Sequence, residues 1–234
     1  MRILFFLAIL TSCSTKSWRE ASRESIGIAP VPSTHQEEVF QIYYARAFSW
    51  KGYFAIHPWI SWKEAGESTY TVAQVTTWNV RRLGSAISVV KDLPDRKWFD
   101  SEPSLLFDVR GEKAKLIIEK VKKAIEHYPY KDFYKIWPGP NSNTFVSYII
   151  REVPEIDIEL PSTAIGKNYF PGVVSSTASE TGFVFSLFGL AGFHLGAAEG
   201  VGVHFLGLNF GVDLWTPAIE IPFAGRLGFP DKGF

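Results

Sequence analysis

The stretch from Phe183 to Val212 limits most strongly what this chain can fold into. It contains many glycines and one charged residue, Glu199. The part before Glu199 is nearly long enough for a transmembrane helix, which needs about 20 apolar residues. Repeated glycine, two histidines and the alternation in Val201-Gly202-Val203-His204-Phe205 instead favour strands joined by tight turns. We therefore expect buried strands here, with a span or hairpin in the membrane as the alternative.

The N-terminus has the layout of a secretory signal. One positive charge, Arg2, precedes an apolar run that is too short to span a membrane as a helix. The sequence Leu10-Thr11-Ser12-Cys13 then resembles the bacterial lipobox, where cleavage exposes a cysteine that carries acyl chains such as palmitate. The resemblance implies a signal peptide over residues 1–12 and a lipid anchor on Cys13. An ordinary signal peptide with an incidental cysteine is the alternative.

Residue 14 bears on where such an anchor would lie. In the sorting scheme of bacterial lipoproteins, a residue other than aspartate after the lipidated cysteine favours the outer membrane, and Ser14 fits that scheme. We therefore expect a protein of the bacterial cell envelope that is lipid-anchored in the outer membrane, faces the periplasm and has this membrane as its partner.

Composition excludes several kinds of chemistry. Cys13 is the only cysteine, so no disulfide can form within the chain, a packed core must hold the fold together, and a cysteine nucleophile is ruled out. Acidic and basic residues balance at 24 each, which argues against nucleic acid as a partner. The five histidines lack paired metal-ligand spacing, so we expect no metal and no cofactor. Aromatic residues make up 15% of the chain and suit an apolar or sugar ligand.

The rest of the chain predicts a tether and then an antiparallel sheet. Residues 13–36 are mostly polar and end in a proline-rich stretch, which is typical of a tether. Five strand-like segments rich in β-branched and aromatic residues follow, at 39–45, 53–60, 69–76, 86–90 and 105–109.

Two helices complete the predicted domain. Glu112–His127 carries apolar residues on one face and lysines on the other, and a second helix should run from Ser142 to about Val153 before Pro154. We predict an α+β fold in which an antiparallel sheet packs against this helix pair over residues 37–175. Residues 176–234 should form a glycine-rich β extension packed on that domain.

The start of the second helix is the most informative segment for function. Asn141 is a good N-cap, and Ser142 begins the apolar face that Phe145 and Ile149 continue. The Ser142 hydroxyl should therefore point inward at the positive end of the helix, where backbone amides can stabilise a developing oxyanion.

Two resemblances rest on this segment. Asn141-Ser142-Asn143-Thr144-Phe145 is similar to the Asn-Cys-x-x-Phe helix start of permuted papain-like enzymes, which include the lecithin-retinol acyltransferase and permuted NlpC/P60 types. In these enzymes a histidine on an earlier strand precedes the nucleophile. The resemblance implies Ser142 as nucleophile, His57 as base and Gln74 as the group that orients the base. A permuted papain-like fold is implied with them.

The second resemblance covers most of the chain after the tether. It is to a bacterial family known only as domain of unknown function 3750. The residues that carry it are Trp137–Val146, Val153-Pro154-Glu155, Leu160–Lys167 and Leu206–Val212.

Three interpretations follow. Helix dipole and imidazole can draw a cysteine toward thiolate but cannot ionise a serine, so Ser142 would need His57 within hydrogen-bonding distance. The favoured interpretation is a non-catalytic binding module that keeps the groove and contacts its ligand through Asn141 and Asn143. The alternatives are a serine-dependent acyltransferase or amidase/peptidase acting on lipid or peptidoglycan peptide, and a structural lipoprotein that docks through the apolar C-terminal region.

Overall fold

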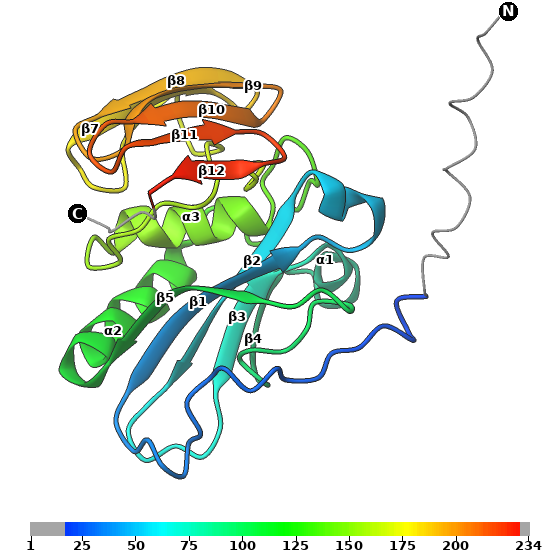
Figure 1. Ribbon diagram of the computed structural model, residues 1–234. Helices are drawn as coiled ribbons and strands as arrows, with labels where there is room; N and C mark the ends of the chain where they lie inside the picture. Colours follow the sequence, from blue (N-terminus) through cyan, green and yellow to red (C-terminus); the bar gives the residue numbers. More distant parts are fainter. Residues whose placement is uncertain (1–16, 230–234) are drawn as a thin grey trace, which may run out of the picture.

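The computed structural model describes residues 17–229, and five strands in the first half of the chain form one antiparallel sheet (Figure 1). These strands are β1 Val39–Arg46, β2 Ile56–Lys63, β3 Thr71–Val75, β4 Ile87–Lys91 and β5 Ser104–Arg110. They pair in the order β4-β3-β2-β1-β5, which we call the first sheet. The predicted strand at 53–60 starts later than expected, because Ser49–Tyr53 winds into the 3-10 turn η1.

Two helices cover one face of the first sheet and build its core. α2, Gly111–His127, packs on β1 and β5, whereas α3, Ser142–Glu152, packs on β2 and β3. Apolar side chains at helical spacing in both helices meet the inward side chains of the strands, and Ile60, Ile117 and Phe145 are fully buried there. A third helix, α1, Thr77–Leu83, was not predicted and ends at Gly84 in the left-handed conformation.

The opposite face of the first sheet is covered by the chain that precedes β1. The Asp95 carboxylate accepts hydrogen bonds from the Ser25 hydroxyl at 2.6 Å and from the backbone amides of Ile28 and Ala29 at 2.7 and 3.1 Å. Ala21 is buried beside Trp98 in a small second core. The part of the predicted tether that the structure describes, residues 17–36, is therefore docked on the domain.

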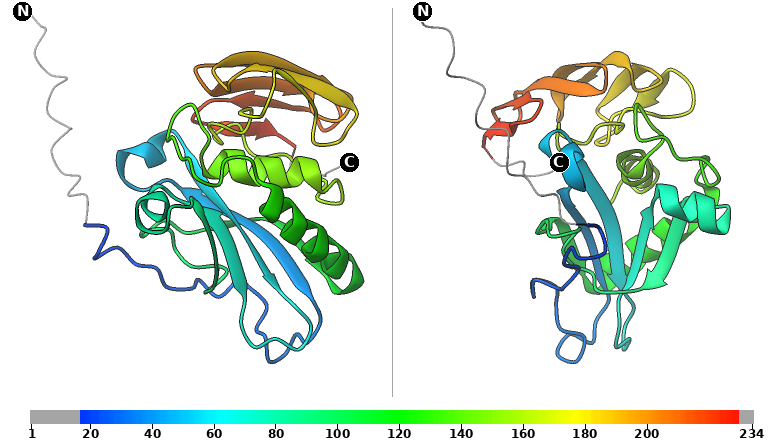
Figure 2. Two further views of the ribbon diagram at one scale, coloured as in Figure 1. Left: turned by 180° about the vertical axis from the view of Figure 1, so that it is seen from behind. Right: turned by 90° about the vertical axis from the view of Figure 1, so that its right-hand side faces the viewer.

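Seven strands in the last third of the chain form a second antiparallel sheet. They are β6 Val174–Ser176, β7 Gly182–Leu187, β8 Ala191–Gly196, β9 Gly200–Phe205, β10 Leu208–Asp213, β11 Ala218–Ile221 and β12 Gly225–Gly228. Each strand pairs with its neighbours in sequence, so this second sheet is a meander. It lies over α3, which is held between the two sheets (Figure 2). The predicted α+β class is confirmed.

The second sheet places its apolar side chains on the outside. On the outer face one cross-strand row contains only apolar residues, which are Phe183, Leu195, Val201, Val212, Ile219 and Leu227. All six are at least 40% exposed. The expectation that these strands are buried is therefore wrong for the side chains on the outer face, which belong to alternate residues of each strand. The strands themselves were predicted, and no helix within residues 17–229 is both long and apolar enough to cross a bilayer.

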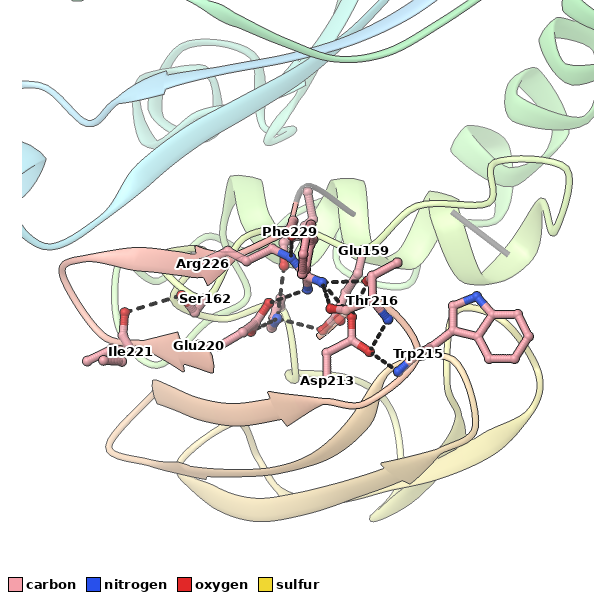
Figure 3. A network of polar contacts seen from close by, with 11 residues as sticks. Glu159, Ser162, Asp213, Trp215, Thr216, Glu220, Ile221, Arg226 and Phe229 are labelled. Atoms are coloured by element: carbon pink, nitrogen blue, oxygen red, sulfur yellow. Dashed lines mark hydrogen bonds and ion pairs between the residues drawn. The ribbon is translucent and has the colours of Figure 1, made fainter. Parts of the chain in front are cut away.

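The inner face of the second sheet is polar instead. Figure 3 shows Asp213, Glu220 and Arg226 in one network with Glu159 from the chain that leaves α3. Arg226 Nη2 lies 2.6 Å from Asp213 Oδ2, and the nearby Lys167 Nζ donates to Glu159 Oε1 at 2.7 Å. Buried charges are tolerated when they are paired and hydrogen-bonded, as these are.

Glycines make room for histidines on this inner face. The ring of His194 lies over Gly202, where an added Cβ would come 2.2 Å from His194 Cε1. The ring of His204 lies over Gly192 in the same way, with 2.5 Å to its Cε1, and its Nε2 is 3.0 Å from the Ser186 hydroxyl. The glycine-histidine pattern of this segment therefore reflects close cross-strand packing on the inner face of the second sheet.

Candidate functional site

A cavity of about 570 Å³ lies where the first sheet, the start of α3 and the turns of the second sheet meet. Most of its lining side chains are aromatic or aliphatic, and Trp50, Trp137 and Phe223 at its edge are each at least 45% exposed. The cavity is thus accessible from the surface. Its volume falls in the range of about 300–1,000 Å³ that is typical of small-molecule sites.

His57 reaches this cavity from β2. Its ring stacks on Trp98 with 3.7 Å between centroids and 5° between planes. Its Nε2 is 3.2 Å from Gln74 Oε1 on β3. Because an amide oxygen only accepts hydrogen bonds, Nε2 carries the proton and Nδ1 keeps the lone pair. The structure therefore brings His57 and Gln74 together, with Gln74 fixing the tautomer of the ring.

Burial makes His57 a weak base. It lowers the pKa of His57 to about 3, and the hydrogen bond to Gln74 opposes this shift only in part. The positive charges of Arg96 and Arg23 lower the pKa further. A general base works best with a pKa near the operating pH, so His57 is neutral but poorly suited to take a proton from a serine at pH 7.

Ser142 lines the same cavity at the first position of α3 and is 3% exposed. Its neighbour is the phenol of Tyr134, whose pKa is raised by burial and lowered in part by contacts with the hydroxyl and backbone amide of Ser142. Within residues 17–229 no hydrogen bond joins Ser142 to His57. The two residues predicted as nucleophile and base therefore share a cavity without forming a pair.

The two asparagines beside Ser142 have different roles in the structure. The Asn141 side-chain oxygen accepts from the amides of Asn143 and Thr144 at 2.9 and 3.2 Å, and its Nδ2 donates to the carbonyls of Ile136 and Ile165. All of its polar atoms therefore hold the local fold together. Asn143 Nδ2 also donates to the Ile165 carbonyl, at 2.8 Å, but Asn143 Oδ1 is buried without a partner in the described part of the chain.

Thr76 and Tyr134 are among the cavity residues that sequence reasoning missed. Thr76 is 2% exposed, and its hydroxyl has no hydrogen-bond partner among residues 17–229. Thr76 ends a strand-like run whose sequence does not indicate which side chains face a cavity. Tyr134 lies in a loop, where no periodicity predicts the orientation of a side chain. An unpaired buried polar group costs free energy, so the Thr76 hydroxyl and Asn143 Oδ1 destabilise the fold beside this cavity.

The cavity lining has few charged or metal-ligating side chains. Lys51 is the one charged side chain among the described residues that line the cavity, because His57 is neutral. In the described part of the chain, no three histidine, aspartate, glutamate or cysteine side chains gather closely enough to hold a metal ion. Cys13, the predicted lipidation site, lies outside the described residues.

Comparison with known proteins gives little information about activity. The guanine nucleotide-binding protein alpha-6 subunit of Dictyostelium discoideum is 33% identical over 96 residues, which are 41% of this chain and 26% of that protein. The chain thus spans about a quarter of that relative's length. No solved structure matches, and the resemblance to papain-like enzymes is not confirmed.

The family comparison covers more of the molecule. The family described as protein of unknown function (DUF3750) matches residues 37–169, which include the first sheet, the helices α1, α2 and α3, and the residues His57, Gln74 and Asn141 to Asn143. The second sheet lies beyond this match and adds Leu206, Leu208 and Phe223 to the cavity. More than half of the chain is matched, and the protein belongs to the DUF3750 family.

Proposed function

We propose that this protein is a non-catalytic binding module of the bacterial cell envelope and that it is anchored to the outer membrane through lipid on Cys13. In this proposal the protein holds a lipid-like molecule in its cavity. The observation that carries the proposal is the surface-accessible cavity of about 570 Å³ with mainly aromatic and aliphatic walls. Burial of an apolar chain against such walls contributes about 25 cal/mol per Å² of apolar surface removed from water. The guanine nucleotides named for the Dictyostelium relative are not proposed as ligands, because the walls lack a cluster of cationic side chains.

Three features favour binding over catalysis. The Ser142 hydroxyl contacts Tyr134 instead of a base. The pKa of His57 is about 3 as a result of burial. Two amides of the first turn of α3, those of Asn143 and Thr144, are already bonded to the Asn141 side chain, which reduces what the helix start can offer an oxyanion.

Tryptophan fluorescence tests the proposal directly, because Trp50, Trp78, Trp98 and Trp137 line the cavity. Titration of the purified chain with long-chain lipids below their micellar concentration should give saturable changes in emission. Ala55→Trp fills part of the cavity and should weaken binding at least about tenfold, as expected when apolar contacts are lost or blocked.

Ala191→Trp is the matched control, because Ala191 lies on the outer face of β8 and does not line the cavity. This variant should bind like the wild type. Absence of saturable binding in the folded wild type, or equal weakening in both variants, would overturn the proposal.

A second candidate is a serine-dependent acyltransferase or amidase. It is favoured by one specific observation, the hydrogen bond from His57 to Gln74 beside a cavity that Ser142 also lines. A fluorophosphonate probe discriminates between the two. Labelling that disappears in both Ser142→Ala and His57→Ala would establish this candidate, whereas an unlabelled but ligand-binding wild type supports the binding module.

A further inference from the structure

We infer that the protein docks on the bilayer through the aromatic edge of its cavity, so that a lipid acyl chain enters the cavity directly from the bilayer. The inference rests on the proposed lipid anchor and binding function, and it adds the surface that faces the membrane. Three observations carry it: the exposed aromatic side chains around the cavity, the charge of the cavity walls, and the position of the anchored end of the chain.

The edge of the cavity combines exposed apolar side chains from both halves of the molecule. Trp137 Nε1 donates to the Leu206 carbonyl at 2.9 Å, which joins the loop before α3 to the turn between β9 and β10. The ring centroid of Phe54, beside η1, lies 5.3 Å from that of Phe223 in the turn between β11 and β12. The apolar side chains at this edge, which we call the rim, are at least 43% exposed; they are Trp50, Phe54, Ile136, Trp137, Leu206 and Phe223.

The chemistry of the rim suits a bilayer interface. Tryptophan is enriched where membrane meets water, because its ring is apolar and its N–H can meet the head groups. Lys51 Nζ lies 5.9 Å from the ring centroid of Trp50, and a lysine there can pack its stem on the rim while its charge attracts anionic head groups. Among the described residues that line the cavity none is acidic, so no carboxylate of the lining opposes this attraction.

The anchored end of the chain leaves the domain close to the rim. The Ala21 amide donates to the Ser17 carbonyl at 3.2 Å, and Ala21 belongs to the small second core. Phe48, the N-cap residue of η1, packs against this core, which also contains the cavity residue Trp98. Figure 2 accordingly shows the first described residues and η1 on the same side of the molecule. Cys13 lies four residues before Ser17, and four residues span at most about 14 Å, so a lipid on Cys13 holds this side at the bilayer.

The outer face of the second sheet is also apolar, but it suits this bilayer less well. The residues that precede β1 cover the far face of the first sheet, and α3 lies between the two sheets (Figure 1). The outer face therefore lies across the molecule from the anchored end. Over residues 174–228 the outward side chains of its strands also include neither tryptophan nor a cation.

Cysteine accessibility on vesicles tests which face meets the bilayer. Cys13 is the only cysteine, and acylation of the mature chain blocks its thiol, so a cysteine introduced elsewhere is the one reactive thiol. Tyr53→Cys places this thiol on η1, beside the rim but outside the cavity, at a position that is 65% exposed. Phe193→Cys is the matched control on the outer face of β8, at a position that is 43% exposed.

The lipidated mature chain is inserted from outside into preformed vesicles of phosphatidylethanolamine and phosphatidylglycerol and treated with a charged maleimide that cannot cross the bilayer. The rate is compared with that of the unlipidated Cys13→Ser chain in solution. At Tyr53→Cys the rate should fall at least about tenfold on the vesicles, because the reactive thiolate does not form in an apolar layer. At Phe193→Cys the rate should stay within about twofold of its value in solution, because a thiol in water keeps its reactivity.

Sedimentation with the same vesicles measures what the rim contributes without the anchor. Trp50→Ala in the Cys13→Ser chain should weaken vesicle binding by about five- to tenfold, because the exposed indole no longer enters the bilayer interface. Phe193→Ala on the outer face is the control and should bind vesicles as the parent chain does.

The outcomes separate this inference from the proposed function. If Cys13 carries no lipid, or if the chain shows no saturable binding of long-chain lipids, the proposed function fails and the inference fails with it. If the chain is anchored and binds lipid but the thiol of Phe193→Cys is the protected one, the bilayer covers the second sheet and the inference is wrong. If both thiols stay reactive, or if Trp50→Ala and Phe193→Ala bind vesicles equally well, the rim does not dock, whereas the binding function stands.

Discussion

The two sheets of this molecule solve the problem of burial in opposite ways. The first sheet turns apolar side chains toward α2 and α3, so that Ile60, Phe40 and Ile42 are fully buried. The second sheet turns Val203, Phe193 and their neighbours outward and keeps its charged side chains inside. The comparison shows that alternation along a strand fixes which residues share a face, but the surroundings decide which face is covered.

The difference also implies different sources of stability. Apolar burial against helices stabilises the first sheet, at about 1.5–3 kcal/mol for each fully buried large side chain. The second sheet is held on the domain by polar contacts, such as the hydrogen bonds from Asn168 Nδ2 to Asn209 Oδ1 and from Asn209 Nδ2 to the Ser162 carbonyl, and by the ion pair of Lys167 with Glu220 at 3.9 Å. Substitutions at equivalent strand positions should therefore have unequal effects.

The largest effect is expected from a charge placed on the covered face of the first sheet. Ile60→Lys would bury an unpaired ammonium in the core and should abolish cooperative folding, because an unpaired buried charge costs more than a typical domain's margin of stability. Val203→Lys, in the middle of β9 and 54% exposed, should change the free energy of unfolding by about 0.5 kcal/mol or less. Urea denaturation measures both. Similar destabilisation by the two variants would show that the outer face is covered in solution.

The next largest effect should come from the charged network between α3 and the inner face of the second sheet. Lys167 is 5% exposed at its side chain and pairs with Glu159. Burial lowers the pKa of Lys167, but attraction to Glu159, Glu220 and Glu199 together outweighs it, so that the pKa is raised. Lys167→Met leaves the Glu159 carboxylate, whose side chain is only 21% exposed, without its cation, and such a loss typically costs about 3–5 kcal/mol.

Lys91→Met is the control, because the Lys91–Glu67 pair of the first sheet is exposed and such pairs contribute about 0–1 kcal/mol. Chemical denaturation of both variants gives the comparison. Equal losses would mean that the inner network contributes no more than a surface ion pair.

The same contrast explains how much the sequence could predict. The strands of the first sheet, the helix at Ser142 and its Asn141 cap all carry local signals in β-branched residues, periodicity and capping chemistry. The strands of the second sheet were predicted as well. Their orientation was not, because apolar alternation reads the same whichever face packs on the domain.

The candidate site was predictable in a similar, partial way. His57, Ser142, Asn141 and Asn143 were chosen from one helix start and one strand, and all four line the cavity. Thr76 could not be chosen, because no local pattern shows that this residue lines a cavity. The contributions of Leu206 and Phe223 depend on how the second sheet docks, which no local pattern encodes.

A smaller effect is expected where glycine and histidine meet. Gly202→Ala puts a Cβ 2.2 Å from His194 Cε1 and 2.8 Å from the Phe210 carbonyl oxygen, and such overpacking costs about 1–3 kcal/mol. Gly211→Ala, in the same inner row, meets nothing closer than 3.6 Å and should be tolerated. Thermal unfolding measured side by side tests whether the second sheet depends on this packing. If Gly202→Ala does not lower the unfolding temperature, the His194 ring or β8 can move away from β9 without loss of stability.

The smallest effect concerns a property that the two sheets share, their buried neutral histidines. Burial lowers the pKa of His57 in the first sheet to about 3, and in the second sheet burial and His194 lower that of His204 to about 4. The unfolded chain, with histidine pKa values near 6.5, binds more protons between these limits, so stability decreases as the pH falls below about 6.5. His57→Asn removes one such group and should reduce the loss between pH 7 and pH 5 by about 1–2 kcal/mol. Some dependence of the free energy of unfolding on pH will remain in the variant, because His204 still titrates.

Urea denaturation at pH 7 and pH 5 measures this dependence. The same loss in the variant as in the wild type would mean that the folded state protonates His57 as easily as the unfolded chain does.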